Sequence, residues 1–499
     1  PFCRSSTQFP LYCVPSWKGC PLYLITFLVA HLLSFQHTLQ PGSLSSWLSV
    51  ASKMQGLAAS LRQLFQLPRC TAPDSLIHPL LDGLDTEVAR VTPAQLEGKD
   101  PNQEDPQSGK FPLLVCAAHG QLQLVQKLLV QGADPVKASK KDGRFPLLLA
   151  ADGGHTPVIF LLLSRGAKVE QSSLVTGEFP LLLAAAKGRC AAARLLIQHG
   201  ADVSKVQKQT GAFPLYAAAM GGHHDLVHLL LEHAAQPDQR NEATGATALI
   251  MAAAGGRSAA AEALLCGGAN VAQEAMDGSF PLLLAAMDNS ASTCQLLLAH
   301  RADPNQVNCA DCSFPLLLAS ALGKSEAVEA LCRNKADVEQ LHARNGEFPL
   351  LAAAKAGHLG VVQCLLRHGA KPNERHEESG STPLLMAAMT GHHETAEALL
   401  QKGAAPCQTN RLDGQFPLLT AVEHKHVAVV GVLLRRRADP TQAHATSGSL
   451  PVQVAMAAGD SQLVELLQRR GAAGPRLLAG HTEGKELKEL KEPKAKGRA

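Results

Sequence analysis

Cys309 and Cys312 form a Cys-x-x-Cys pair, a spacing that occurs in zinc sites and in redox-active thiols. A structural zinc site takes four ligands, usually from two such pairs, and the chain has no second pair. The pair therefore indicates either a metal- or redox-responsive loop or two ordinary loop thiols, and we favour the ordinary thiols.

The 21 histidines could also bind a metal, and two adjacent pairs, His223-His224 and His392-His393, occur among them. Five histidines, however, stand nine residues after one recurring position of a repeated block, which indicates a structural role. These five are His155, His223, His358, His392 and His426. We expect no metal at any of these positions.

Catalytic motifs are missing from the sequence. Gly323-Lys324-Ser325 matches the end of a phosphate-binding P-loop, but Leu318 stands where that loop needs a glycine. Neither a G-x-S-x-G nucleophile elbow nor a His-Glu-x-x-His segment occurs. We therefore expect that the chain is not an enzyme and has no catalytic residues, no cofactor and no small-molecule substrate.

The sequence repeats a block built on Phe-Pro-Leu-Leu-Leu-Ala-Ala eleven times. Successive blocks are 34 residues apart, except for one step of 33 residues. The motif proline, or the residue in its place, is found at Pro112, Pro146, Pro180, Pro214, Ala248, Pro281, Pro315, Pro349, Pro383, Pro417 and Pro451. A fixed period of this size is typical of a solenoid of stacked units, which offers an extended binding surface.

Each block contains the start and stop signals of two helices. Its proline suits the first turn of a helix, where the missing N–H has no intrahelical partner. A glycine such as Gly188 then supplies a left-handed helix cap, and only Asn289 and Lys425 replace this glycine. A second, amphipathic helix follows, and an Asp-Gly or Asn-Gly pair in many blocks is typical of a hairpin turn.

Two further positions of the block carry recurring side chains. Phenylalanine precedes the motif proline in eight blocks, and we expect these rings to form a buried ladder. Thr247 and Thr382 take the same position in two other blocks. Glutamine recurs before the turn, for example at Gln171 and Gln239. These amides would either stack on one another and hold adjacent hairpins in register, or contact a ligand.

The block resembles the ankyrin repeat. The match is clearest at Ser381–Ala388 (Ser-Thr-Pro-Leu-Leu-Met-Ala-Ala), Gly391-His392, Ala398–Leu400, Gly403-Ala404 and Lys141–Gly143. The family's usual signature, T-P-L-H-x-A, is altered, because Phe replaces most of its threonines and Leu, Ile, Tyr or Gln its histidine. The resemblance implies an all-α fold: an ankyrin-repeat solenoid of stacked helix-turn-helix units with hairpin loops.

The resemblance covers residues 75–473, with a degenerate cap at 75–102 followed by eleven repeats. Residues 1–74 share no period with the array, and we expect them to be disordered or, before Met54, not translated. Their apolar run, Pro21 to Phe35, is short for a membrane span of about 20 residues, so a membrane partner is not favoured. A signal-peptide core, an anchor and a fragment of a longer chain are the alternatives. Residues 474–499 form a charged tail.

Composition narrows the function classes further. The chain is 46% hydrophobic and 4% aromatic with a formal net charge of +3, which excludes a disordered chain and gives no sign of nucleic-acid binding. Its 13 cysteines and the absence of an Asn-x-Ser/Thr site favour a reducing compartment. We expect a cytoplasmic protein, or a nuclear one if the weak import-like run Lys491–Arg498 is used.

The resemblance implies a non-enzymatic scaffold or adaptor that binds a protein or peptide. Ankyrin arrays usually bind partners with their hairpin tips and with the exposed end of the first helix on the concave face. At such positions the chain has Lys110, Arg144, Glu178, Lys187, Met220, Met287, Asp288, Glu347, Lys355, Met389, Gln415 and His424. The alternative is the targeting arm of a larger enzyme or membrane protein whose other domain lies outside this sequence.

The repeat at 247–280 departs most from the others. Ala248 replaces its motif proline, Thr247 replaces its phenylalanine, and the block is one residue short. In a linear array, local stability depends on each unit and its two neighbours. We therefore expect the array to open first, or to hinge, at this repeat.

Overall fold

The computed structural model describes residues 100–471, which lie in the second of the two units of the chain, Ala72–Ala499. These residues form 22 α-helices and no strand, which confirms the predicted all-α fold. The segments predicted at 1–74 and 474–499, and the part of the predicted cap before residue 100, lie outside the described residues.

Each repeat begins with a short helix of seven or eight residues. These first helices are α4 (Pro112–Ala118), α6 (Pro146–Gly153), α8 (Pro180–Ala186), α10 (Pro214–Gly221), α12 (Ala248–Ala254), α14 (Pro281–Met287), α16 (Pro315–Ala321), α18 (Pro349–Ala356), α20 (Pro383–Thr390), α22 (Pro417–Glu423) and α24 (Pro451–Ala457). Their starts fall on the motif proline or on Ala248, as predicted.

A second helix of nine residues follows each first helix. These second helices are α5 (Leu122–Val130), α7 (Thr156–Ser164), α9 (Cys190–Gln198), α11 (His224–Glu232), α13 (Ser258–Cys266), α15 (Ala291–Ala299), α17 (Ser325–Arg333), α19 (Leu359–Arg367), α21 (His393–Gln401), α23 (Val427–Arg435) and α25 (Ser461–Arg469). A membrane-spanning helix needs about 20 residues, and none of the helices in residues 100–471 could cross a membrane.

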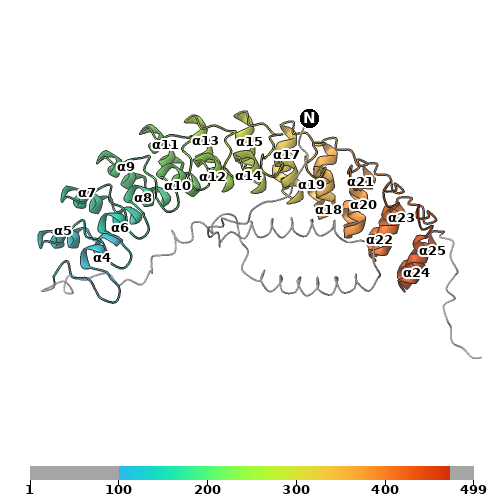
Figure 1. Ribbon diagram of the computed structural model, residues 1–499, viewed down its shortest axis with the longest axis horizontal. Coiled ribbons are helices and arrows are strands. Elements are labelled where there is room, and N and C mark those ends of the chain that lie inside the picture. Colours follow the sequence, from blue (N-terminus) through green and yellow to red (C-terminus); the bar gives the residue numbers. More distant parts are fainter. Residues whose placement is uncertain (1–99, 472–499) are drawn as a thin grey trace, which may run out of the picture. The chain divides into compact units, whose positions relative to one another are not determined.

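The helices stack in two rows (Figure 1). Each first helix packs against the first helix of the next repeat, and the second helices pack in the same way. Within the array, the first helices lie along the inner side of the curve and the second helices along its outer side. A pair of short helices cannot bury its apolar residues alone, so stacking of neighbours creates the core.

A left-handed residue ends the turn between the two helices, as the glycine pattern predicts. Gly120 has φ +66°, and Asn289 and Lys425 adopt the same conformation at +64° and +59°. Close packing is a second reason for glycine at position 120. A Cβ there would lie 2.5 Å from Nδ1 of His155 in the next repeat, which no side chain could accept without movement.

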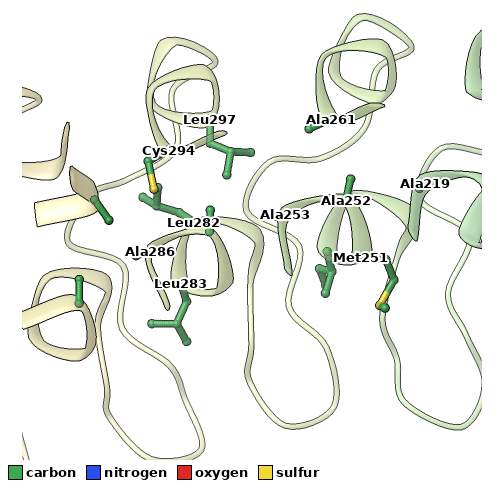
Figure 2. Close-up of a cluster of buried hydrophobic side chains, with 14 of the residues drawn as sticks. Ala219, Met251, Ala252, Ala253, Ala261, Leu282, Leu283, Ala286, Cys294 and Leu297 are labelled. Carbon is green, nitrogen blue, oxygen red and sulfur yellow. The ribbon is translucent and has the colours of Figure 1, made fainter. Parts of the chain in front are cut away.

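The predicted phenylalanine ladder is confirmed. Every ring of the eight motif phenylalanines is at most 2% exposed. They are Phe111, Phe145, Phe179, Phe213, Phe280, Phe314, Phe348 and Phe416. Deeper in the core, Leu282 and Ala286 of α14 lie close to Cys294 and Leu297 of α15 (Figure 2).

Side-chain bonds connect each repeat to the one before it. Nε2 of His155 lies 3.0 Å from the carbonyl oxygen of Ala118, the last residue of the preceding first helix. His223, His358 and His426 make the same contact. The recurring histidine is therefore a structural residue, as its periodicity indicates.

The glutamines also reach back to the preceding repeat, but not as predicted. Nε2 of Gln171 donates to the carbonyl oxygen of Val136 at 2.9 Å, and Gln239 donates to that of Ser204 at 3.0 Å. The prediction of stacked amides is therefore wrong, because the amides bond backbone rather than one another. Their predicted effect, holding adjacent hairpins in register, follows from these bonds.

The hairpins close through backbone hydrogen bonds. In a regular repeat, the Ser139 N–H donates to the Arg144 carbonyl at 2.8 Å. In the short repeat, the Ala275 N–H donates to Ser279 at 2.8 Å, so the loop closes one residue earlier. The missing residue is thus removed from the hairpin tip and leaves the helices intact.

Candidate functional site

The predicted contact residues come from two parts of each repeat: the hairpin tip directly before the motif phenylalanine, and the end of the first helix. The structure brings these two parts together within single repeats. Nζ of Lys355, in α18, lies 3.8 Å from Oε1 of the tip residue Glu347. Nε2 of Gln415, a tip residue, donates to Oε2 of Glu423 in α22 at 3.1 Å. We call the surface formed by the tips and the first-helix ends the inner face.

The N-terminal part of the inner face is polar and partly buried. Lys110 and Arg144 are half-buried, and Nε of Arg144 lies 3.9 Å from Oδ2 of Asp142. Glu178 was expected at the surface, but it is only 5% exposed. The Thr176 hydroxyl donates to its carboxylate at 2.9 Å. Burial raises the pKa of the Glu178 carboxyl above its ordinary value. This side chain therefore contributes more to the packing of the array than to its binding surface.

The central part of the inner face is apolar. Met220 and Met287 are half-buried at the ends of α10 and α14. Leu322, directly after α16, is 48% exposed, and Met389 of α20 is 37% exposed. Methionine side chains adapt to partners of different shape. This arrangement can bury apolar groups of a ligand.

The remaining predicted residues are also placed at the surface. Lys187 is half-buried after α8, and Asp288 is half-buried after α14. Burial raises the pKa of the Asp288 carboxyl, while Lys324 and Arg257 oppose this shift. His424 is exposed, and its ring stacks on that of His426 with 6.0 Å between the centroids.

The cysteine pair singled out in the sequence lies at a hairpin tip. Cys309 is exposed, and Cys312 takes the turn glycine's position with φ +66°. Contact with the Glu274 carboxylate raises the pKa of the Cys309 thiol. Cys266, the last residue of α13, is a further exposed thiol.

A different group of potential metal ligands emerges from the structure. Among residues 100–471, only Glu329, Cys364 and His368 place three ligand atoms of this kind within 4.8 Å of one another. The sequence analysis missed them because they come from two repeats. The signal that was available is their spacing on successive second helices, Glu329-x-x-Cys332 and Cys364-x-x-x-His368, which puts each pair on one helix face.

Comparison with known proteins identifies the repeat. The family model "Ankyrin repeats (3 copies)" matches six stretches, at residues 87–173, 113–207, 181–275, 282–376, 316–410 and 350–444. The chain belongs to the ankyrin repeat family. Ankyrin repeats are generally protein–protein interaction modules, and the fold is typically non-enzymatic.

Solved structures also resemble this ankyrin array. One is the crystal structure of the human ASB11 ankyrin repeat domain, which is 27% identical. The match covers 46% of this chain and 99% of that chain, with a TM-score of 0.42. The comparison with curated proteins finds no match.

Proposed function

We propose that the array is a non-enzymatic scaffold or adaptor that binds a protein or peptide on its inner face. The observation that carries this proposal is the contact between tips and helix ends, Lys355 with Glu347 and Gln415 with Glu423. Variable positions from two parts of the repeat thereby share one surface, which extends along successive repeats. A linear ligand can contact several repeats of such a surface at once.

The chemistry of the inner face favours a ligand with apolar groups. Leu322 and Met389 expose apolar surface in the C-terminal half, and Met220 and Met287 add flexible side chains. Lys110 and Arg144 at the N-terminal end would interact with acidic groups of the same ligand. Lys187, Asp288 and His424 are the further polar contacts that we propose.

We place this scaffold in a reducing compartment, the cytoplasm or the nucleus. All nine cysteines among the described residues are free thiols, and several of them are buried in the core. Disulfides persist mainly in oxidising compartments, whereas free thiols are usual in reducing ones.

The inner face can be tested by capturing proteins from native lysate with the full chain as bait. A Leu322→Glu/Met389→Glu variant places two charges on the inner face. A matched control, Val130→Glu/Phe160→Glu, places two charges on second helices. There the side chains of Val130 and Phe160 are 72% and 57% exposed, respectively. Circular dichroism should first show the same helix content for all three proteins.

We expect the inner-face variant to lose the captured partner and the control to retain it. Each charge buried in an apolar contact should weaken binding strongly, because a charge leaves water only at a high cost in free energy. Equal capture by the inner-face variant and the wild type would contradict the proposal, as would loss of capture in the control alone.

A further inference from the structure

Three side chains of neighbouring repeats, those of Glu329, Cys364 and His368, meet between α17 and α19 in the row of second helices. Glu329 and Cys332 lie on α17, and Cys364 lies on α19, which His368 follows directly. The Cys364 thiol donates to Oε2 of Glu329 at 3.0 Å, and Nε2 of His368 lies 3.5 Å from Oε1. One thiol, one imidazole and one carboxylate thus face one another.

The imidazole of His368 is poorly satisfied. Its Nε2 atom is buried, and its contact with Oε1 of Glu329, at 3.5 Å, does not have the geometry of a hydrogen bond. Buried polar atoms are nearly always satisfied in folded proteins, so an unsatisfied one calls for an explanation such as an ion. The recurring histidines of the array differ in this respect, since Nε2 of His155 is satisfied by a backbone carbonyl.

The chemical types of the ligand atoms favour one kind of metal ion. Thiolate and imidazole together favour Zn²⁺ over the hard cations Mg²⁺ and Ca²⁺, which prefer oxygen ligands. Tetrahedral zinc with metal–ligand distances of 2.0–2.3 Å sets its ligands about 3.3–3.8 Å apart. The donors of Glu329, Cys364 and His368 already lie within 4.8 Å of one another, so side-chain rotations of about 1 Å would be sufficient.

Two arginines complete the surroundings of the cluster. Nε of Arg333 lies 2.9 Å from Oε1 of Glu329, and Nη1 of Arg367 lies 3.0 Å from Oε2. The two guanidinium groups would hold and orient the carboxylate from outside the first coordination sphere.

We propose that Glu329, Cys364 and His368 bind one Zn²⁺ ion between α17 and α19. Such an ion links two consecutive repeats, because Glu329 lies on α17 while Cys364 and His368 belong to the next repeat. The site lies in the row of second helices, whereas the inner face is built from the first helices and the hairpin tips. Zinc would therefore stiffen this part of the array without occupying the surface that we propose for the partner.

The test uses the full chain, stripped of metal with a chelator and then dialysed against Zn²⁺ or Co²⁺. The variants are His368→Gln and Cys364→Ser. Matched controls are Cys294→Ser, which removes a buried thiol of α15, and Cys309→Ser/Cys312→Ser, which removes the hairpin-tip pair. Elemental analysis gives the stoichiometry, and the cobalt protein shows thiolate-to-metal charge-transfer bands if cysteines are ligands.

We expect the two ligand variants to bind one equivalent of zinc fewer than the wild type and both controls. Loss of an indirect contact typically weakens metal affinity 10–100-fold, so loss of a direct ligand should weaken it by at least about 100-fold. Zinc should also raise the unfolding temperature of the wild type and not that of His368→Gln, whose partly exposed side chain can be replaced without disturbing the core.

Two results would overturn the proposal. One is an unchanged zinc stoichiometry in His368→Gln, which keeps the fold testable even if Cys364→Ser unfolds. The other is a Cys332–Cys364 disulfide, detected by mass spectrometry of the alkylated protein, because oxidised sulfurs cannot act as thiolate ligands.

Discussion

The repeats that begin at Phe280 and at Thr382 stabilise the start of their first helix in different ways. Thr382 accepts a hydrogen bond from the Leu385 N–H at 3.2 Å and so caps α20. Phe280 makes no such bond before α14, but its ring is fully buried. The two first helices nevertheless begin at the same position of the repeat. The comparison shows that burial of a ring can replace a side-chain cap where the neighbouring repeats cover it.

The largest loss of stability is expected when a buried ring is removed. Phe280→Ala should lower the free energy of unfolding by about 3–5 kcal/mol, because it removes apolar contacts and leaves a cavity. Thr382→Ala, at the matching position, should cost only about 1 kcal/mol, the usual contribution of a helix cap. Denaturant unfolding of both variants measures the difference. The explanation fails if Phe280→Ala costs no more than Thr382→Ala.

A smaller change in the free energy of unfolding is expected when Thr382 is replaced by phenylalanine, the residue that eight other repeats have at this position. Thr382→Phe loses a cap but adds a buried ring, and these contributions oppose each other. We expect a net change below about 1.5 kcal/mol, the range of well-tolerated core substitutions. The same denaturant melts test this expectation. A loss as large as that of Phe280→Ala would show that the slot at Thr382 cannot accept a ring.

The smallest effect concerns local opening of the repeat that starts at Thr247. Its Ala248 lacks the fixed φ that proline gives the other first helices, a difference worth about 0.4–1 kcal/mol. Hydrogen exchange should therefore be faster for amides in residues 250–275 than for those in residues 181–198. Equal protection in both segments would refute a hinge here. The structure gives this repeat a buried Ala248 and Leu249 like its neighbours.

Local signals in the sequence predicted the architecture well. Proline at the first helical position and a left-handed residue such as Gly120 mark where each helix begins and where each turn closes. The ring positions were also predictable, because a period of 34 residues places every phenylalanine in the same environment.

Contacts between repeats were harder to predict. The acceptor of Gln171 is a backbone carbonyl, which no residue pattern identifies. The burial of Glu178, at a hairpin tip, depends on how the repeats pack. The cluster of Glu329, Cys364 and His368 depends on which faces of α17 and α19 meet. Each of these features combines residues about one period apart, where the sequence alone does not fix the geometry.

The histidine and glutamine bonds between repeats have a direction. His155 and Gln171 both reach an acceptor in the repeat that precedes their own, and His223 and Gln239 do the same. During synthesis on the ribosome, the acceptors of each repeat thus emerge before their donors. Every newly made repeat can dock onto a folded template, so the array can grow from its N-terminal end one repeat at a time without breaking bonds already formed.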